Sequence, residues 1–545
     1  MNAKNITSKF KSIIFLILPF LVYFLVATYK LSEPSLWVNE CLQRHYAIQN
    51  FEDFYFLVSR TSFQSPLYPF ILSLWIKVND GVFWMRFLSV LFGFFGAIGF
   101  YKSVKEVSGQ NLALFSVIVY SCVFRLIYNF QEVTEYAFMI GNMCWAAYYF
   151  IKTLKNMDIK NIVLFNIFGA LSFASQYSAL IVIMAFSFFL FLKAVINKNI
   201  QEVKNIIVSY IINLTFVCLP IYHFYMKTQL PVVFDKNNVF NVPINQNIFW
   251  DFYQGFIQTV KYNFFPNLTY ETNEIFMNFH VPDIVVNILA YLFLIVLTIS
   301  VVRLLKSKRN RIIIISMVKK PKSEKSMIIV YLIWSSILSW CIYYSLVKAG
   351  LYSYGEFGFR WGIFITPLWL LTAIVTISDF LTELGLSYSK LFLKIGKILS
   401  YSIVFLTAIY CFTGVYGVYK HWEKEDTKGM VQRWYEIEGY KEKTILYYGA
   451  KYGFMYYLEK DPRFDESYKN NIVKIPWVED GDYYEFRAII SKLLDNNFNF
   501  PVIYLCFAHT GDDMHTILLL FKDKGYKVSI IYDEHDAVIC KLVKK

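Results

Sequence analysis

The stretch Ile13-Ile-Phe-Leu-Ile-Leu-Pro-Phe-Leu-Val-Tyr-Phe-Leu-Val-Ala27 is almost wholly apolar. With its flanks it is long enough to cross a bilayer as a helix. A second run, Ile284 to Val302, has the same character. The whole chain of 545 residues is 57% hydrophobic and 17% charged, whereas soluble domains are roughly 45–50% apolar and about 25% charged. The sequence therefore excludes a soluble globular protein and predicts a polytopic α-helical membrane protein.

The same apolar pattern predicts about eleven transmembrane helices. They lie near residues 12–29, 84–101, 112–128, 134–151, 161–175, 177–192, 205–224, 283–302, 326–347, 361–378 and 398–418. The first is expected to be a retained helix and not a cleaved signal peptide, because its apolar run is long and no A-x-A site follows.

The basic residues are concentrated in the membrane part. Residues 1–418 hold 34 Lys and Arg against 19 Asp and Glu, a balance of +15, whereas residues 419–545 hold 19 against 21, a balance of −2. Short basic loops between apolar spans are typical of the cytoplasmic side, so this excess indicates membrane orientation and no nucleic-acid partner. It predicts a multi-pass protein of the cytoplasmic (inner) membrane, with the N-terminus inside and the C-terminus outside.

Two domains are predicted. Residues 1–418 form a transmembrane domain whose outside loops, 30–83 and 225–282, contain apolar runs with Trp and Tyr at 66–75 and 249–257. Such runs are typical of amphipathic helices at the interface. Residues 419–545 alternate apolar runs at 444–448, 502–507, 528–532 and 537–542 with helix-like stretches at 450–459, 483–496 and 513–522. This alternation predicts an extracytoplasmic α/β domain, in which Cys506 and Cys540 are either buried thiols or a disulfide.

Several short motifs occur in order along the chain. They are Ser35-Leu-Trp-Val-Asn-Glu40, Ser65-Pro-Leu-Tyr68, Arg86 to Gly93, Asn129-Phe-Gln-Glu-Val-Thr-Glu-Tyr136, Gln176-Tyr-Ser-Ala-Leu180 and Phe359-Arg-Trp361 with Pro367. In this order and on these loops they resemble the C-class (GT-C) integral-membrane glycosyltransferases. The similarity is to the branch of the protein O-mannosyltransferases and the lipid A aminoarabinose transferase.

The resemblance implies a GT-C fold and a glycosyltransferase that takes a hexose or pentose from a polyprenyl-phosphate carrier, such as undecaprenyl phosphate. The acceptor would be a lipid, a glycan or a protein on the outer face, and membrane lipids would surround the spans. The reaction needs a base for the acceptor and cations for the departing phosphate. The resemblance places Glu40 and Glu132 as candidate catalytic acids and Arg86 and Arg360 as candidate donor-phosphate ligands.

Asn39 departs from the family, which has an aspartate, the proposed base, before this glutamate. The Asn39 amide cannot accept a proton at neutral pH. Three explanations stay open: Glu40 or Glu132 acts as the base, the acceptor needs little activation, or the chain binds a lipid-linked sugar without transferring it. The family's His-Pro-Pro is Gln64-Ser65-Pro66 here, so the metal requirement is unknown, and no cofactor beyond a possible divalent ion is predicted.

Aromatic and polar side chains of the same loops are candidates for the substrate pocket. They are Trp37, His45, Tyr68, Glu135 and Tyr136. Each has a simpler alternative: an interfacial acid can be merely solvated, His45 can be a hydrogen-bonding surface residue, and Arg86 can extend its side chain to the membrane surface. The segment His509 to His515 could hold a metal, but a helix capped by Asp512 or Asp513 explains it better.

Three other functions compete with a transferase. A polyprenyl-linked glycan polymerase or ligase would use the same outward site. A transporter or lipid-sugar flippase should carry ionisable residues near the middle of several spans, and the acids here lie at span ends. A non-catalytic sugar-lipid binding protein remains open because of Asn39.

Overall fold

The computed structural model describes residues 3–61, 65–215, 219, 248–264, 324–349, 360–385, 390–420, 425–449, 451–476, 483–495, 501–508 and 513–545. Two compact units divide the chain: the described residues of the helical unit lie within 3–29 and 49–420, and those of the C-terminal unit within 30–48 and 425–545. The segment 30–48, which precedes most of the membrane helices, thus belongs with the C-terminal unit. The sequence predicts one domain boundary, at residue 418, and so places residues 30–48 in the transmembrane domain instead.

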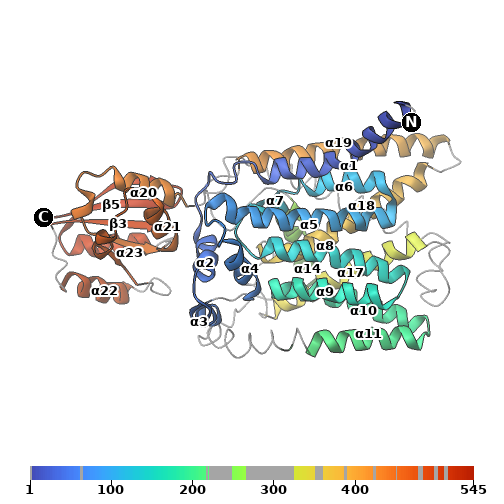
Figure 1. The fold of residues 1–545 in the computed structure, drawn as a ribbon, viewed down its shortest axis with the longest axis horizontal. Coiled ribbons are helices and arrows are strands. Elements are labelled where there is room, and N and C mark those ends of the chain that lie inside the picture. The colour runs from blue at the N-terminus through green and yellow to red at the C-terminus, as the bar shows by residue number, and fades with distance from the viewer. Residues whose placement is uncertain are drawn as a thin grey trace. The chain divides into compact units, whose positions relative to one another are not determined.

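The helical unit consists of long helices that run side by side (Figure 1) and of several short helices. They are α1 (Ala3–Ala27), α3 (Phe51–Thr61), α4 (Leu67–Trp75), α5 (Val82–Ser108), α6 (Gln110–Tyr120), α7 (Phe124–Phe130), α8 (Tyr136–Lys155), α9 (Ile159–Ser175), η1 (Tyr177–Ala179), α10 (Leu180–Ile196), α11 (Ile200–Asn213), α14 (Ile248–Phe264), α17 (Glu324–Lys348), η4 (Arg360–Ile365), α18 (Thr366–Gly385) and α19 (Lys390–Lys420).

Most predicted spans coincide with helices. The span 283–302 and the end of 205–224 lie outside the described residues. In the part of the chain that is described, four stretches are individually long and apolar enough to cross a membrane: Val82–Ser108, Tyr177–Ile196, Glu324–Lys348 and Gly362–Thr382. The pair α6 and α7 would make a fifth, and Ile14–Ala27, Ile159–Ser175 and Tyr401–Tyr416 are shorter apolar helices. The chain is a multi-pass membrane protein, and the count of eleven stays a prediction.

The predicted span 112–128 is broken and not straight. α6 and α7 meet at a bend of 68°, although no Pro or Gly lies between them. The carbonyl oxygen of Cys122 in this bend lies against Gly414 of α19, where a Cβ atom would be 1.8 Å away. Residues 119–130 are all buried, and a broken helix is tolerated in a membrane only where protein covers it.

Small residues bring α5 and α8 into close contact. A Cβ atom on Gly96 would lie 3.0 Å from the Cα of Gly141, and a Cβ on Gly141 would lie 2.7 Å from the carbonyl oxygen of Phe92. Membrane helices lack a hydrophobic driving force for association, so small residues that allow close packing are the usual solution. These glycines therefore hold α5 and α8 close together.

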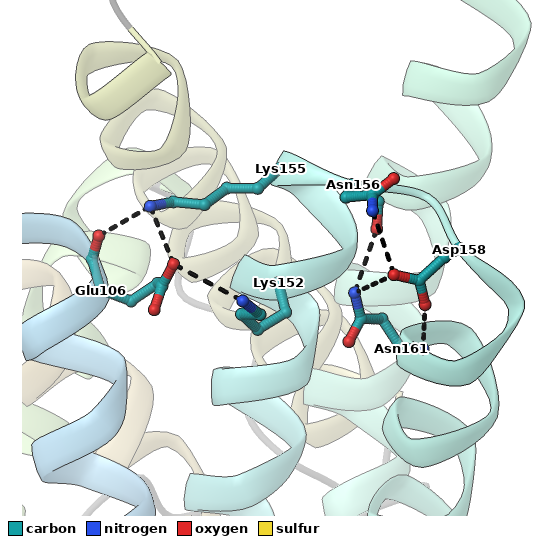
Figure 2. A network of polar contacts seen from close by, with 6 residues as sticks. All are labelled: Glu106, Lys152, Lys155, Asn156, Asp158 and Asn161. Atoms are coloured by element: carbon teal, nitrogen blue, oxygen red, sulfur yellow. Dashed lines mark hydrogen bonds and ion pairs between the residues drawn. The ribbon is translucent and has the colours of Figure 1, made fainter.

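A polar network closes the end of the unit where α5 and α8 finish (Figure 2). The Nζ of Lys155 donates to the backbone oxygen of Glu106 at 2.9 Å and lies 3.0 Å from its Oε1, while the Nζ of Lys152 lies 3.8 Å from the same carboxylate. Beside it, Asp158 caps α9 by accepting from the amide of Asn161 at 2.8 Å. Figure 2 shows these side chains at one end of the helices, which we name the basic end.

The C-terminal unit is a five-stranded sheet with helices on both faces. Its elements are α2 (Val38–Ala47), α20 (Thr427–Tyr435), η5 (Tyr440–Glu442), β1 (Ile445–Gly449), α21 (Lys451–Lys460), η6 (Glu466–Asn471), β2 (Ile472–Lys474), α22 (Tyr483–Asp495), β3 (Val502–Ala508), α23 (Asp513–Asp523), β4 (Tyr526–Glu534) and β5 (Ala537–Lys544). The strand order is β2-β1-β3-β5-β4, with β1 parallel to β2 and β3, and β5 antiparallel to β3 and β4.

The two faces of the sheet have separate cores. α20 and α21 pack with Trp434 and Phe454 on one face, and α22 and α23 pack with Phe486 and Phe521 on the other. The predicted α/β domain is therefore confirmed.

Cys506 belongs to the core under α20 and α21, and Cys540 belongs to the core under α22 and α23. Both are free thiols. Because they point to opposite faces of the sheet, the alternative of a disulfide between them is wrong.

Candidate functional site

Arg86 lies on the face of α5 that the other helices cover. It is buried, with 5% of its surface exposed. Ser89, one turn further, contacts the hydroxyl of Tyr68 on α4 at 3.3 Å. Gly93, two turns further, packs closely against α7, since a Cβ atom added to it would lie 2.6 Å from the ring of Phe130. An Arg this buried is not one that extends to the membrane surface, so that alternative is wrong for Arg86.

The turn between α7 and α8 carries both predicted acids. Glu132 is 5% exposed and Glu135 1%. The Nε2 of Gln131 donates to the backbone oxygens of Ala27 at 3.2 Å and Tyr29 at 3.0 Å, which fixes the turn to the end of α1. The hydroxyl of Ser175 donates to the backbone oxygen of Glu135 at 2.8 Å. Both acids are enclosed by protein, so the alternative of merely solvated carboxylates is wrong. Tyr136, which starts α8, is also buried.

Further motifs reach the same end of the helical unit. η1, at the Gln176 motif, contacts η4, which begins at Arg360, and η4 also contacts α8 and α14. Gly362 of η4 lies against Tyr343 of α17, where a Cβ would be 3.4 Å from the hydroxyl. The side chain of Arg360 lies outside what the structure describes. We name the end formed by the first turn of α5, the turn 131–135, η1 and η4 the motif end.

Arg125 belongs to this group of buried charges and was not anticipated as a site residue. It is 1% exposed at the start of α7, and its guanidinium carbon lies 5.4 Å from the ring centre of Tyr128. The sequence contained a signal, because an Arg inside an apolar stretch of a membrane segment is by default a functional candidate. Arg86, Arg125, Glu132 and Glu135 give the helical unit two buried cations and two buried acids. Buried charges are costly unless they are paired or used.

An ion pair near the last turn of α17 was also not anticipated. The Nζ of Lys348 lies 2.7 Å from the Oδ2 of Asp251, which also accepts from the hydroxyl of Tyr344 at 2.8 Å. These contacts hold α14, part of the predicted outside loop 225–282, against α17. This part of the loop is therefore bound to the membrane helices of the helical unit.

The remaining predicted residues lie in the C-terminal unit. Glu40 is fully buried in the first turn of α2, and its Oε2 accepts from the backbone amide of Trp37 at 3.2 Å. Asn39 beside it is half-buried. His45, at the other end of α2, stacks on Tyr452 of α21 with ring centres 4.2 Å apart. Glu40 therefore also caps its own helix, a role that the sequence analysis did not consider.

The predicted site residues thus form two groups. Tyr68, Arg86, Glu132, Glu135 and Tyr136 lie in the helical unit with the backbone of Arg360, and Trp37, Asn39, Glu40 and His45 lie in the C-terminal unit. Among the described residues, no three His, Cys, Asp or Glu side chains gather closely enough to hold a metal ion. The roles of the predicted site residues in binding and catalysis stay predictions.

Comparison with known proteins gives a family match over part of the chain and a fold. Residues 63–223 match the family model described as dolichyl-phosphate-mannose-protein mannosyltransferase. No curated protein sequence matches the chain. Among solved structures, the chain is similar to the archaeal oligosaccharyltransferase AglB from Archaeoglobus fulgidus in complex with an inhibitory peptide and a dolichol-phosphate, with TM-score 0.51 and 10% identity over 97% of this chain and 74% of that one.

Two further solved structures are similar to the chain. The Archaeoglobus fulgidus oligosaccharyltransferase tethered with an acceptor peptide matches with TM-score 0.51 and 12% identity, over 96% of this chain and 73% of that one. ArnT from Cupriavidus metallidurans in the apo state matches with TM-score 0.49 and 10% identity, over 98% of both chains.

The fold is that of the C-class (GT-C) integral-membrane glycosyltransferases. Within this class, residues 63–223 match the protein mannosyltransferase family, and this match confirms the resemblance that the motifs predicted. The matched segment contains Tyr68, Arg86, Glu132, Glu135 and Tyr136, the predicted residues of the helical unit with described side chains.

Proposed function

We propose that this chain is a glycosyltransferase that moves a sugar from a polyprenyl-phosphate carrier to a lipid, glycan or protein acceptor on the outer face of the cytoplasmic membrane. The observation that carries the proposal is the match of residues 63–223 to the mannosyltransferase family. The similar AglB structure, which holds a dolichol-phosphate and an inhibitory peptide, supports a lipid-linked donor.

The proposed reaction is a substitution at the anomeric carbon of the donor sugar. The acceptor oxygen forms the new bond to this carbon, the bond from the carbon to the phosphate oxygen breaks, and its electron pair leaves with the polyprenyl phosphate. Guanidinium groups suit the departing phosphate because they offer several donors in a fixed geometry. Arg86 and Arg360 are proposed for this role, and buried Arg125 is a third candidate.

The acceptor hydroxyl loses a proton in the same step. Either Glu40 or Glu132 is proposed to receive this proton, since Asn39 cannot accept it. Both residues are buried, and this supports the proposal, because a base enclosed by protein can take a proton from a bound acceptor away from bulk water. Trp37 and His45 of the C-terminal unit, and Tyr68, Glu135 and Tyr136 of the helical unit, are each proposed to contact substrate. A divalent ion beside one of the two acids remains a proposal.

The proposed side of the membrane follows from the charges. Lys102, Lys105, Lys152, Lys155 and Lys160 belong to the predicted inside segments, and Lys152 and Lys155 lie at the basic end (Figure 2). The positive-inside rule then places the motif end outside the cytoplasm. Nucleotide sugars are confined to the cytoplasm, so an outward site would take its sugar from a lipid carrier.

The test uses the purified chain in liposomes with polyprenyl-phosphate sugars that differ in the sugar. Mass spectrometry of glycolipids and glycoproteins from cells with and without the gene would first name the acceptor class and the sugar. We expect transfer of one sugar per acceptor, with release of polyprenyl phosphate. A product with many repeat units would indicate a polymerase or ligase instead. Movement of the lipid-linked sugar across the liposome membrane, without transfer of the sugar to an acceptor, would indicate a flippase.

Asn39 favours one other candidate function, a non-catalytic subunit that binds a lipid-linked sugar. Such a subunit would bind the donor in liposomes, protect it from a soluble glycosidase and release no polyprenyl phosphate. Release of the carrier by the chain alone would exclude this function.

A further inference from the structure

The residues that carry Asn39 and Glu40 are built into the C-terminal unit. We name residues 35–45 the acid segment. Leu36 and Glu40 are fully buried, and Ser35 and Cys41 are nearly so. The hydrogen-bond partners of Ser35, Leu36 and Val38 lie 387 to 421 residues further along the chain. Contacts at such a separation fix the segment through the tertiary structure and not through its local sequence.

The turn before α20 holds the start of the acid segment. Asp426 caps α20 by accepting from the amide of Gly429 at 2.8 Å, and its other oxygen accepts from the hydroxyl of Tyr532 on β4. The hydroxyl of Ser35 donates to Asp426 at 3.4 Å and accepts from the amide of Lys428 at 3.1 Å. Ser35 is therefore bound into the N-terminus of a helix that the sheet anchors.

Glu425 holds the first turn of α2. The residue is 3% exposed, and its Oε2 accepts from the amide of Val38 at 3.1 Å. This amide is one of the helix-start donors that lack a partner within the helix, and a negative charge at this position is favourable. Glu40 accepts from the preceding amide, that of Trp37. Glu425 thus fixes the backbone turn from which the Glu40 side chain projects.

One face of α21 completes the contact. The hydroxyl of Tyr457 accepts from the amide of Leu36 at 2.7 Å. Gly453, one turn earlier, allows close approach, since a Cβ there would lie 3.3 Å from the Sγ of Cys41 and 3.5 Å from the backbone oxygen of Leu36.

Aromatic rings on the same face of α21 contact the end of α2. Tyr452 stacks on His45 at an interplanar angle of 22°, and the ring of Tyr456 lies 4.6 Å from the guanidinium carbon of Arg44. The opposite face of α21 places Phe454 and Leu458 in the core of the sheet. α21 therefore connects the sheet directly to the acid segment.

We propose that the C-terminal unit positions Glu40 for sugar transfer, through Glu425, Asp426 and Tyr457. None of the three is assigned contact with substrate, so they are positioning residues. The inference rests on the proposed function, and it gives the C-terminal unit a part in the chemistry.

The test compares two Tyr→Phe substitutions in the full-length protein. Tyr457→Phe removes the hydroxyl that accepts from the Leu36 amide. Tyr435→Phe is the matched control, because its hydroxyl also bonds to the backbone, donating to Leu458 at 3.0 Å, but does not reach the acid segment. We expect Tyr457→Phe to lower kcat about tenfold with unchanged donor KM, since small misplacements of a reacting group have large effects on rate. Tyr435→Phe should stay within about twofold of the wild type. Equal kcat for the two variants would overturn the inference.

Combination with Glu40→Gln shows whether Tyr457 acts through Glu40. In the Glu40→Gln background we expect Tyr457→Phe to cause no further loss of kcat, because residues that act as a unit are non-additive. A further tenfold loss in the double variant would mean that Tyr457 acts elsewhere, and the positioning role would be wrong.

Hydrogen exchange gives a readout that does not depend on activity. The amides of Leu36 and Val38 should exchange faster in Tyr457→Phe than in Tyr435→Phe. Unchanged exchange in a transfer-competent protein would overturn the positioning inference and leave the proposed function standing. If the wild-type protein releases no polyprenyl phosphate from any donor, the proposed function is wrong. The positioning inference then fails with it, even where exchange is faster in Tyr457→Phe. The two failures are therefore distinguishable.

Discussion

Asn39 stands where the family that this chain resembles has an aspartate, and the structure leaves it half-buried beside fully buried Glu40. If the pocket still accepts a carboxylate at this position, Asn39→Asp restores the family's pair of acids. We expect the rate of transfer from the lipid-linked donor to match or exceed that of the wild type. Asn39→Ala is the control for loss of the amide. A collapse of activity in Asn39→Asp alone would show that the pocket has been remodelled around the amide.

Glu40 and Glu132 compete for the role of base, and their surroundings differ. Glu40 also caps α2, whereas Glu132 lies in a turn fixed by Gln131. We expect Glu40→Gln to lower kcat by about 100-fold or more, as for loss of a general base, with a normal yield of folded protein. Glu132→Gln, assayed at the same donor concentration, is the comparison. Wild-type turnover by Glu40→Gln would remove Glu40 from the mechanism and leave Glu132 as the candidate.

Arg86 offers the clearest test of phosphate binding in the helical unit. A hydrogen bond to a charged group contributes about 1.5–3 kcal/mol, so Arg86→Ala should raise the donor KM by about tenfold or more. Arg86→Lys should retain part of the affinity, because a Lys keeps the charge but not the forked donors. Lys77→Ala removes an exposed cation nearby in sequence and serves as the control. Equal donor affinity in all three variants would refute the phosphate role.

At the scale of elements, the packing of α5 on α8 has a site that even one methyl group would disturb. A Cβ on Gly141 would lie 2.7 Å from the carbonyl oxygen of Phe92, which is backbone and cannot move aside. Gly141→Ala should therefore destabilise the protein by about 1–3 kcal/mol, the usual cost of overpacking. Thermal unfolding in detergent would measure this as a lower Tm.

Gly169→Ala is the matched control for this packing. Its Cβ would lie 3.2 Å from a side-chain carbon of Ile183, and a side chain can adjust where a carbonyl cannot. We expect a Tm close to that of the wild type. Similar losses in the two variants would show that Gly→Ala in any helix of this unit has the same effect and that the α5–α8 contact is not special.

The elements that sequence predicted well are those with strong periodicity. The predicted helix-like stretches 450–459 and 513–522 match α21 and α23 almost residue for residue. β2, with three residues, was missed because a run this short has no period to detect. The bend between α6 and α7 was missed for another reason. Its Cys122 carbonyl packs against Gly414, and packing between distant segments leaves no local mark in the sequence.

At the scale of the whole molecule, the candidate residues were predicted but their grouping was not. The order of the motifs placed Glu40 and Arg86 in one outside region, and composition alone assigned the segment 30–48 to the membrane domain. The structure assigns it to the C-terminal unit, through bonds such as that between the Leu36 amide and Tyr457. No periodicity can reveal a hydrogen bond between residues 421 positions apart.

The orientation of the whole chain in the membrane gives the last prediction. The positive-inside rule places the basic end in the cytoplasm and the C-terminal unit outside. In a cysteine-free background, Ser467→Cys, on an exposed part of the C-terminal unit, should react in intact cells with a membrane-impermeant thiol reagent. Lys102→Cys, on an exposed position of α5 near the basic end, should react only after the cells are opened. The reverse pattern would place the motif end in the cytoplasm, where nucleotide sugars are available, and the requirement for a lipid-linked donor would no longer follow from the topology.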